Sequence, residues 1–378
     1  MGWLAIGAAV LVSLGVGQAV AGWWALRHFL AAPGPLPPQR RPGVTILKPL
    51  YGDEPLLEAA LATACAQDYP QFQVVFGLHG ASDTALAVVQ RLRARFPACD
   101  IAVVVNPARH GSNGKISNLM NMLPAARHDV LVIADSDVHA APDYLDDIVA
   151  TLALPGTGLV TSLYTGLAAS AALAGRLGAT AITHGFLPGV LLARALGRQD
   201  CLGATMALRR DTLVAIGGLA ALADDLADDN ALGRKVQALG QAVRLAVSIP
   251  ATTVPETELD ALVRHELRWA RTIRALVPRQ FALSGLQYPL AWAVLAVVVS
   301  AAASWSVLLF LAAWAVRAAV ARGIDVALAG RPGVVTPAPL LLLPLRDLLS
   351  LAVLLAAYAG WEVEWRGQAM RAGASAGP

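Results

Sequence analysis

The sequence has little charge. Only 15% of its 378 residues are Asp, Glu, Lys or Arg, whereas 56% are hydrophobic, and the formal net charge is +3. A chain this apolar does not fit an ordinary soluble protein. Its basic residues gather beside apolar segments and form no broad basic face, which argues against nucleic acid as a partner. Part of the chain is therefore expected to lie in a membrane.

Cysteine is scarce as well. Cys65, Cys99 and Cys201 are widely separated and form no CxxC pair. The sequence therefore indicates neither a zinc site nor a disulfide framework, and it suits a reducing cytosol.

Long uncharged runs are what the sequence does contain. Residues 2–26 carry no charged side chain and exceed the roughly 20 residues that cross a bilayer. No basic segment precedes this run and no clean cleavage site follows it, so an uncleaved anchor is predicted rather than a signal peptide.

Two further apolar runs lie near the C-terminal end. Residues 280–316 suffice for two spans folded back near residues 300–305, or for one interfacial helix and one span. Residues 340–361 offer another span, interrupted by Arg346 and Asp347. Arginines follow the first run and precede the second, so the positive-inside rule places the middle of the chain in the cytoplasm.

The middle of the chain reads as an α/β domain. Residues 44–47, 73–78, 101–105 and 130–134 are β-rich, and they alternate with helical patterns at 54–66, 83–96 and 115–123. Such alternation predicts βαβ units and a mostly parallel, Rossmann-like sheet, with ligands beyond the carboxyl ends of its strands. The predicted boundaries are an anchor (1–30), a Pro/Gly/Arg linker (31–42), the α/β domain (43–275), interfacial and transmembrane helices (276–365) and a tail (366–378).

Two carboxylates end the last of these strands. Asp135 and Asp137 follow the apolar run 130–134, and in extended backbone side chains two positions apart share a face. Carboxylate oxygens are ligands that Mg²⁺ or Mn²⁺ prefers, and such an ion binds diphosphates. The structural alternative is a loop or helix cap leading into the helix after Pro142.

Two other features suit a nucleotide. The Gly/Ser-rich run 110–118 enters a helix, so its backbone N–H groups and Lys115 could hold phosphate oxygens, although the spacing of a Walker A loop is absent. Asp83 follows the second strand and could accept hydrogen bonds from a base or ribose, or cap the next helix.

Two later clusters complete the candidates. Asp228 and Asp229 are adjacent, and their repulsion can raise one pKa into the range of a general base, while helix-dipole stabilisation explains them equally well. His265, Arg268 and Trp269 lie on a predicted amphipathic helix beside the membrane region. Arg suits diphosphate recognition, and a positive-inside flank with an interfacial Trp is the alternative.

Taken in order, these residues resemble a known series. Asp83, Asp135-Ser-Asp137, Asp228-Asp229 and His265-x-x-Arg268-Trp269 are similar to the D, DxD, (E/D)D, QxxRW series of inverting glycosyltransferases with a GT-A fold. Runs 47–50, 115–119 and 203–206 resemble the ceramide glucosyltransferase family. Runs 226–233 and 265–272 resemble its bacterial hopanoid-biosynthesis branch. His265 departs from the first position of QxxRW.

The resemblance implies roles for these residues. Asp83, Lys115, Asp135, Arg268 and Trp269 would bind a UDP-sugar, Asp137 with Asp135 would hold the divalent metal, and Asp229 would be the catalytic base. Asp228, His265, His184 and Cys201 would lie on the acceptor side.

The same resemblance implies a function and a place. The favoured reaction adds N-acetylglucosamine from UDP-GlcNAc to bacteriohopanetetrol, and ceramide with UDP-glucose is the alternative. The implied location is a bacterial inner membrane, with the catalytic domain cytoplasmic. A chain with few spans disfavours processive polysaccharide synthesis. A non-catalytic transport or assembly protein would need to have lost carboxylates that are all present.

Overall fold

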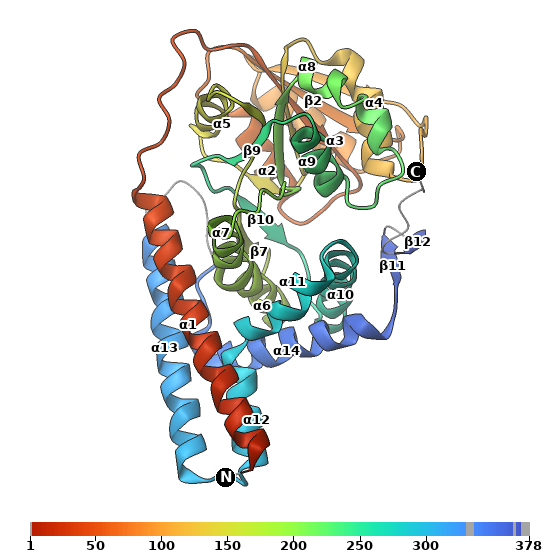
Figure 1. Cartoon of the computed structure of the whole chain (residues 1–378). Coiled ribbons are helices and arrows are strands. Elements are labelled where there is room, and N and C mark those ends of the chain that lie inside the picture. The colour runs from red at the N-terminus through yellow and green to blue at the C-terminus, as the bar shows by residue number, and fades with distance from the viewer. Residues whose placement is uncertain (1, 330–335, 366–367, 372–378) are drawn as a thin grey trace.

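The computed structural model describes residues 2–329, 336–365 and 368–371. A domain of helices around β-sheets lies at one end of the molecule, and a bundle of long helices extends away from it (Figure 1). The α-helices are α1 (Trp3–Ala31), α2 (Leu57–Cys65), α3 (Ala85–Arg95), α4 (Gly114–Met122), α5 (Tyr144–Leu152), α6 (Leu173–Ala181), α7 (Leu187–Ala195), α8 (Arg210–Ala215), α9 (Asp228–Ala238), α10 (Leu259–Leu276), α11 (Pro278–Leu283), α12 (Pro289–Val299), α13 (Ser304–Leu328) and α14 (Leu343–Ala356).

The main sheet has seven strands in the order β3-β2-β1-β4-β8-β6-β9. All neighbouring pairs are parallel except those made by β8, which runs antiparallel to β4 and β6. The predicted α/β class and mostly parallel sheet are therefore confirmed. The main-sheet strands are β1 (Val44–Pro49), β2 (Phe72–Leu78), β3 (Asp100–Val105), β4 (Val130–Ala134), β6 (Thr157–Thr161), β8 (Thr205–Arg209) and β9 (Ala242–Leu245).

A second sheet lies beside the carboxyl end of β4. Its order is β5-β10-β7, formed by β5 (Val138–His139), β10 (Ala251–Val254) and β7 (Thr165–Ala168). A hairpin of β11 (Glu362–Trp365) and β12 (Gln368–Arg371) forms the third sheet.

The side chains of the main strands alternate between two hydrophobic cores. On β4, Val130 and Val132 pack with α2, α3 and α5, whereas Leu131 and Ile133 pack with α4 and α9. A strand buried on both faces reads as a continuous apolar run, which is why β4 was recognisable in the sequence. This two-sided core fixes the end of β4, where the candidate residues begin.

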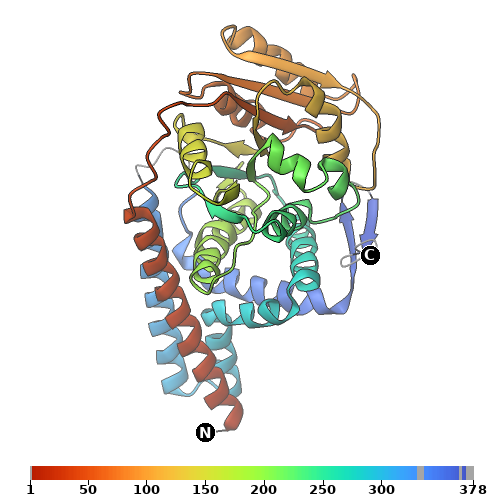
Figure 2. The ribbon, with the colours of Figure 1, turned by 45° about the horizontal axis from the view of Figure 1, so that its top comes forward.

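The helical bundle consists of α1, α12 and α13, which lie side by side (Figures 1 and 2). Within the residues that the structure describes, three segments are long and apolar enough to cross a membrane, namely Trp3–Ala31, Ser304–Leu328 and Leu340–Ala359. The helix α12 continues the segment Pro278–Gln287 after a bend of 69°. The chain folds back between α12 and α13 at residues 300–303, and α12, with 11 residues, is a candidate span only together with the bent segment before it.

Helix α14 is joined to α10 by a buried ion pair. The guanidinium of Arg346 donates two hydrogen bonds of 2.7 Å to the carboxylate of Glu266, and a third bond reaches Ser350. The side chain of Arg346 is only 3% exposed, so both partners of this pair are largely removed from water. A bidentate pair satisfies the charges that make burial costly.

We expect Arg346→Leu to destabilise the protein by about 3–5 kcal/mol, because Glu266 would remain charged and buried without a partner. The double variant Glu266→Leu/Arg346→Leu should recover most of this loss, since both charges are then absent. Thermal unfolding in detergent measures the effect. A double variant as unstable as Arg346→Leu would show that the ion pair is not its source.

Candidate active site

The carboxylates Asp135 and Asp137 lie in a tight turn at the carboxyl end of β4. The amide of Asp135 donates to the carbonyl of Ala204, and the amide of Val138 donates back to the carbonyl of Asp135. The turn means that the extended backbone assumed from the sequence is wrong here. Asp135 instead faces α4, and Asp137 faces β10.

A buried lysine holds this turn. Lys48 lies on β1, is 2% exposed, and its ammonium donates to the carbonyl of Asp135 at 2.7 Å. Burial lowers the pKa of Lys48 to about 8, against the opposing charges of Asp137 and Asp135. Lys48 therefore places positive charge directly under the two carboxylates.

Asp137 is held by the second sheet. The hydroxyl of Thr252 on β10 donates to its carboxylate, and the intervening Ser136 donates to Glu54 at 2.8 Å. Burial raises the pKa of Asp137 to about 6, and the charge of Asp135 adds to this shift. The ionised carboxylate is thus short of positive charge.

Lys115 connects this turn to the start of α9. Its ammonium lies 2.7 Å from a carboxylate oxygen of Asp135 and 3.6 Å from one of Asp228. Burial alone would lower the pKa of Lys115, but the charges of Asp135 and Asp228 outweigh it, and the pKa is raised. Lys115 is therefore a permanent cation shared between two groups of carboxylates.

The loop before α4 differs from the expectation. The amides of His110, Ser112 and Asn113 donate to Ser117, Asp224 and Ala223, and Asn113 also caps α4 by accepting from Ile116. These backbone groups are thus already paired within the protein, so the predicted phosphate cradle is wrong for these three amides. The side chain of Lys115 remains as this segment's candidate.

Asp228 and Asp229 open helix α9. Asp228 is buried and accepts a hydrogen bond of 3.4 Å from the side-chain Nδ2 of Asn113, whereas Asp229 is half-buried. Burial raises the pKa of Asp229 to about 6, and the charge of Asp228 adds to this shift. Lys115 opposes the shift, which leaves a carboxylate able to accept a proton near neutral pH.

Two residues pack close to Asp229. A Cβ atom added at Gly203 would lie 3.0 Å from a carboxylate oxygen of Asp229, so this glycine leaves the space that the carboxylate uses. Cys201 is buried against Gly233 of α9. Burial raises the pKa of the Cys201 thiol, and the charge of Asp229 contributes, so Cys201 is a neutral neighbour of the site.

The charges of the cluster suit a divalent cation. Glu54, Asp135, Asp137, Asp228 and Asp229 outnumber Lys48 and Lys115 by three charges. In the part of the chain that the structure describes, no group of three or more His, Cys, Asp or Glu side chains is arranged to hold a metal. Mg²⁺ is commonly held by one or two carboxylates together with substrate phosphates. Asp135 and Asp137 are the candidates for this role, because they are close enough for the charge of Asp135 to raise the pKa of Asp137.

The structure shows the second of the two roles considered for Asp83, a hydrogen bond at the start of the next helix. Its carboxylate accepts from the amide of Ala85, at the start of α3, and from that of Gly52, which follows β1. The half-buried carboxylate ties the loops after β1 and β2 together at the edge where nucleotides bind in such sheets.

The segment that follows β10 contacts the candidate residues of α10. Two residues beyond this strand, Glu256 binds the ring of His265, and that ring lies 4.5 Å from the ring of Trp269, edge to face. Burial would raise the pKa of Glu256, but the hydrogen bond and charge of His265 outweigh it and lower the pKa. The charge of Arg268 also lowers this pKa. Glu256 therefore interacts with both His265 and Arg268.

His184 lies apart from the carboxylates. It belongs to a π-helical segment, Ile182–Phe186, and its ring makes a hydrogen bond of 2.8 Å with the carboxylate of Asp325 on α13. The ring is fully buried, and burial lowers its pKa. The structure therefore places His184 at the junction with the helical bundle, in a position that connects the two parts of the molecule.

Sequence reasoning missed four polar neighbours of the carboxylates: Lys48, Glu54, Thr252 and Tyr164. Burial raises the pKa of Tyr164, and the charges of Asp229, Asp135 and Asp137 add to the shift. A lysine inside an apolar strand was the one available signal, and it pointed to Lys48.

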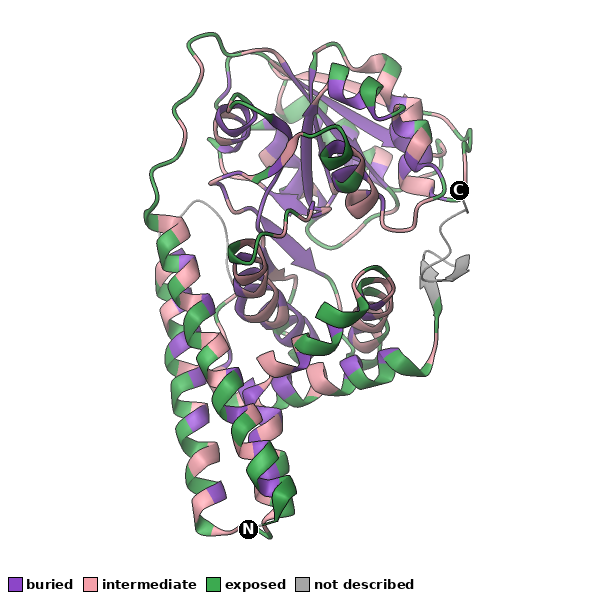
Figure 3. Ribbon diagram, viewed as in Figure 1, coloured by how far each residue is buried: buried purple, intermediate pink, exposed green. Residues whose placement is uncertain are grey.

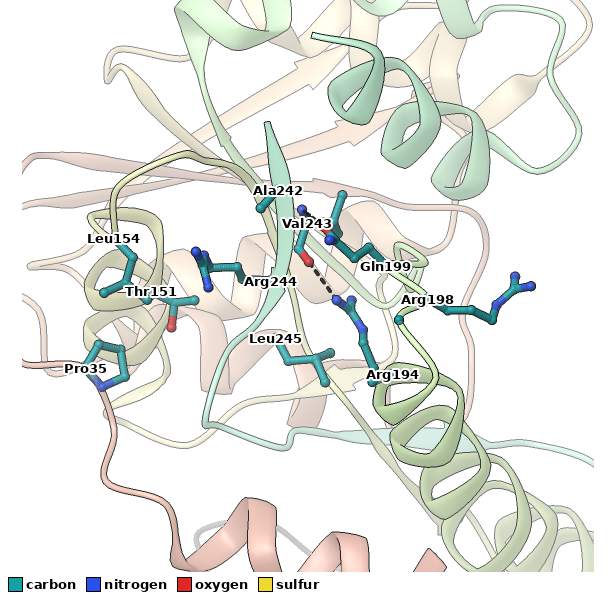
Figure 4. Close-up of a pocket in the computed structure, with 11 residues that line it drawn as sticks. Pro35, Thr151, Leu154, Arg194, Arg198, Gln199, Ala242, Val243, Arg244 and Leu245 are labelled. Carbon is teal, nitrogen blue, oxygen red and sulfur yellow. Dashed lines mark hydrogen bonds between the residues drawn. The ribbon is translucent and has the colours of Figure 1, made fainter. Parts of the chain in front are cut away.

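A cavity of about 420 Å³ lies away from this site, along the outer edge of β9 (Figure 4). No carboxylate lines it. Arg194 donates to the carbonyl of Val243, and Gln199 accepts from the amide of Val243, so these side chains close an edge strand. The polar side chains that line the cavity therefore bond to the backbone of an edge strand, and none of the candidate site residues lies there.

Comparison with known proteins gives a family and a fold. The model of glycosyl transferase family 21 matches residues 7–376. A mannosyltransferase from Pyrobaculum calidifontis, solved with GDP-Man and Mn²⁺, has a TM-score of 0.56 at 21% identity and covers 94% of this chain and 98% of its own. The expected GT-A fold is confirmed.

Two curated relatives share parts of the sequence. The ceramide glucosyltransferase of Komagataella phaffii is 35% identical over 108 residues, which cover 28% of this chain and 21% of the relative. Ceramide glucosyltransferase 3 of Caenorhabditis elegans is 21% identical over 253 residues, which cover 65% of this chain and 54% of the relative. The chain thus spans at most about half the length of these relatives.

Proposed function

The chain belongs to glycosyl transferase family 21 and is a hexosyltransferase, and we propose that it transfers a sugar from a UDP-sugar to a hydroxyl of a membrane lipid with inversion. The observation that carries this proposal is the position of Asp229. It is a half-buried carboxylate with a pKa of about 6, held within reach of Lys115 and of the turn that carries Asp135 and Asp137.

The donor would bind at the carboxyl edge of the sheet. Asp83 is placed for the uridine, and Asp135 with Asp137 would hold a Mg²⁺ or Mn²⁺ ion. That ion supplies positive charge to the diphosphate and to the departing UDP. Lys115 contributes a fixed ammonium on the same side. Arg268 and Trp269, on α10, would close over the diphosphate and the acceptor.

Transfer would be a single displacement. The acceptor oxygen forms a bond to the anomeric carbon as the bond from that carbon to the diphosphate breaks, and UDP leaves with the electron pair. Asp229 takes the proton of the attacking hydroxyl. The neighbouring charge of Asp228 raises the pKa of Asp229 and so favours this proton transfer.

The acceptor is a lipid hydroxyl. The names of the relatives favour ceramide with UDP-glucose. The runs 226–233 and 265–272 are the support for bacteriohopanetetrol with UDP-GlcNAc. Both acceptors carry vicinal polar groups beside a large apolar body, and Tyr164, Cys201 and His265 are candidates for contacts on this side.

We place the chain in a bacterial inner membrane with the α/β domain in the cytoplasm. Arg27 lies near the domain end of α1 and Arg322 near the domain end of α13, while residues 2–26 and 280–316 contain no charged residue. This asymmetry follows the positive-inside rule. A water-soluble donor and a membrane-bound acceptor then meet at the membrane surface.

The decisive experiment is a matrix of donors and acceptors. The purified chain in lipid vesicles is incubated with radiolabelled UDP-glucose, UDP-GlcNAc or UDP-galactose, and with ceramide, bacteriohopanetetrol or diacylglycerol. We expect label in one lipid, dependent on Mg²⁺ or Mn²⁺. Failure with every pair, alongside a ceramide glucosyltransferase that works in the same vesicles, would overturn the proposal.

We expect Gly203→Ala to lower kcat about tenfold, because the new Cβ would lie 3.0 Å from the carboxylate of Asp229 and displace it by a few tenths of an ångström. Gly114→Ala is the matched control. A Cβ there meets nothing within 4 Å, so kcat should stay within about twofold. Equal rates for the two variants would contradict the placement of the base.

A further inference from the structure

Helix α14 does not run along the helical bundle. In Figures 1 and 2 it extends sideways from the bundle, where it contacts α12, α10 and α6, whereas α1 and α13 run together away from the α/β domain. Its 14 residues correspond to about 21 Å, short of the roughly 30 Å of a bilayer core. Hydropathy nevertheless marks Leu340–Ala359 as a candidate span.

The polar and apolar faces of α14 are reversed relative to a helix on a soluble protein. Arg346 and Asp347 are each 2% exposed and point into the molecule. The opposite face is an apolar stripe that protein does not cover (Figure 3). The stripe consists of Leu345 (42% exposed), Leu348 (40%) and Leu355 (60%), and Leu341 (80%), in the 3-10 turn Leu340–Leu342 just before α14, extends it.

Every inward charge of α14 has a protein partner. Arg346 binds Glu266 of α10, and the carboxylate of Asp347 accepts from the amide of Leu290 at the start of α12 and lies 3.8 Å from Arg317 of α13. Neutralised, hydrogen-bonded charges can lie at membrane depth, whereas unpaired ones are costly there. The helix is thus attached through its polar face and leaves its apolar face outside.

The apolar stripe continues into the surface of the bundle. Leu343 packs in one cluster with Val12 of α1 and Leu290 of α12, so α14 begins partway along α1. Further from the α/β domain than this level, the bundle exposes more apolar side chains, among them Leu4 (79%), Val298 (69%) and Leu308 (65%). The apolar stripe of α14 and the apolar surface of the bundle therefore favour the same surroundings. For long apolar helices these surroundings are lipid.

We infer that α14 lies in the plane of the membrane, with its leucine stripe in the hydrocarbon of one leaflet, and does not cross the bilayer. This inference rests on the proposal that α1 and α13 cross it. A helix in the plane keeps one depth along its length, while a spanning helix changes depth by about 1.5 Å per residue.

The arrangement has a consequence for α10. The Arg346–Glu266 ion pair fixes α14 to α10 two residues before Arg268 and three before Trp269. A helix immersed in one leaflet then sets the height of this motif above the lipid. The membrane contact of α14 thereby positions the groups that we propose to meet the donor and acceptor.

The test measures depth along α14 in the full chain. Cys65, Cys99 and Cys201 are first replaced by alanine, and circular dichroism checks that the fold is kept. Single cysteines at Leu341, Leu345, Leu348 and Leu355 then receive nitroxide labels in vesicles. Collision rates with oxygen and with a water-soluble nickel chelate give each depth. We expect high oxygen accessibility, and depths that agree within about 4 Å.

Labels at Leu4, Leu14 and Val20 of α1 are the controls, and their depths should change steadily over about 24 Å. Depths that change by about 21 Å between Leu341 and Leu355 would mean that α14 spans the bilayer. High nickel accessibility would put the stripe in water, and low accessibility to both reagents would mean that protein covers it. Each of these outcomes overturns the inference. A flat profile in α1 would instead contradict the membrane crossing itself.

Discussion

Replacing Asp229 by asparagine should lower the rate of sugar transfer by about 10²- to 10⁴-fold, the usual contribution of a positioned general base. Asparagine keeps the shape of the side chain and can still accept from the amide of Asn230, so α9 should begin unchanged. Binding of the UDP-sugar should change little, because Asp229 acts on the acceptor. Single-turnover transfer and calorimetric titration of donor separate the two effects.

The control for Asp229→Asn is Asp224→Asn. This carboxylate lies five residues earlier, is exposed, and binds Ser112 outside the cluster. Its rate should stay within about twofold, as for most surface substitutions. A near wild-type rate for Asp229→Asn would remove the base from the mechanism, and an equal loss in both variants would point to the fold of this segment.

The pH dependence follows from the same carboxylate. Asp229 acts ionised, and its pKa is raised to about 6, so kcat/KM should fall about tenfold per pH unit below pH 6 and be level above it. Asp137 also has a pKa raised to about 6, but protons and the metal ion compete for it. At saturating metal, the fall of kcat/KM below pH 6 that Asp229 causes should keep its position on the pH axis. A fall that moves to lower pH as metal is added would be assigned to Asp137.

Asp137→Asn should cost about 10³-fold in transfer, because the metal that neutralises the diphosphate supplies several kcal/mol of stabilisation. The amide still accepts from Thr252, so the local fold should persist while the charge is lost. Unlike Asp229→Asn, this variant should also weaken donor binding and abolish its dependence on Mn²⁺. Calorimetry with UDP-sugar, with and without Mn²⁺, distinguishes them.

Asp143→Asn is the matched control for Asp137→Asn. Asp143 is exposed, lies at the start of α5 and makes no side-chain capping bond there. Its donor affinity and rate should equal those of the wild type within about twofold. If Asp137→Asn retained Mn²⁺-dependent donor binding, Asp137 would not be a metal ligand.

Much of the α/β domain could be predicted from sequence because its strands are buried on both faces. The run 130–134 coincides with β4, and the other predicted strands agree with β1, β2 and β3 within two residues. Continuous apolar runs of this length between helical patterns have few other interpretations. The carboxylates after β4 followed from the same boundary.

The partners of those carboxylates could not be predicted in this way. Lys48 reaches the carbonyl of Asp135 across 87 residues of sequence, and Thr252 reaches Asp137 across 115. Such contacts depend on which strands become neighbours, and local patterns do not specify this. The amides of the loop before α4 were misjudged for the same reason, since Asp224 and Ala223 lie more than 100 residues further on.

The orientation of α14 lies beyond hydropathy for a different reason. The segment 340–361 is apolar enough to cross a bilayer, but mean hydropathy contains no information about direction. The two charges at positions 346 and 347 were the one indication in the sequence of how this helix is oriented, because they lie on one face of it. Their partners on α10, α12 and α13 exist only in the folded chain.

The central claim is base-assisted transfer with inversion, and the anomeric configuration of the product tests it most directly. The sugar of the UDP donor is linked to the diphosphate in the α configuration, so a single displacement assisted by Asp229 gives a β-linked glycolipid. The purified chain in vesicles is therefore incubated with donor, Mn²⁺ and lipid acceptor, and the product is examined by NMR. We expect a β-glycoside and one UDP released per glycolipid formed. An α-linked product, or release of free sugar without glycolipid, would contradict this mechanism.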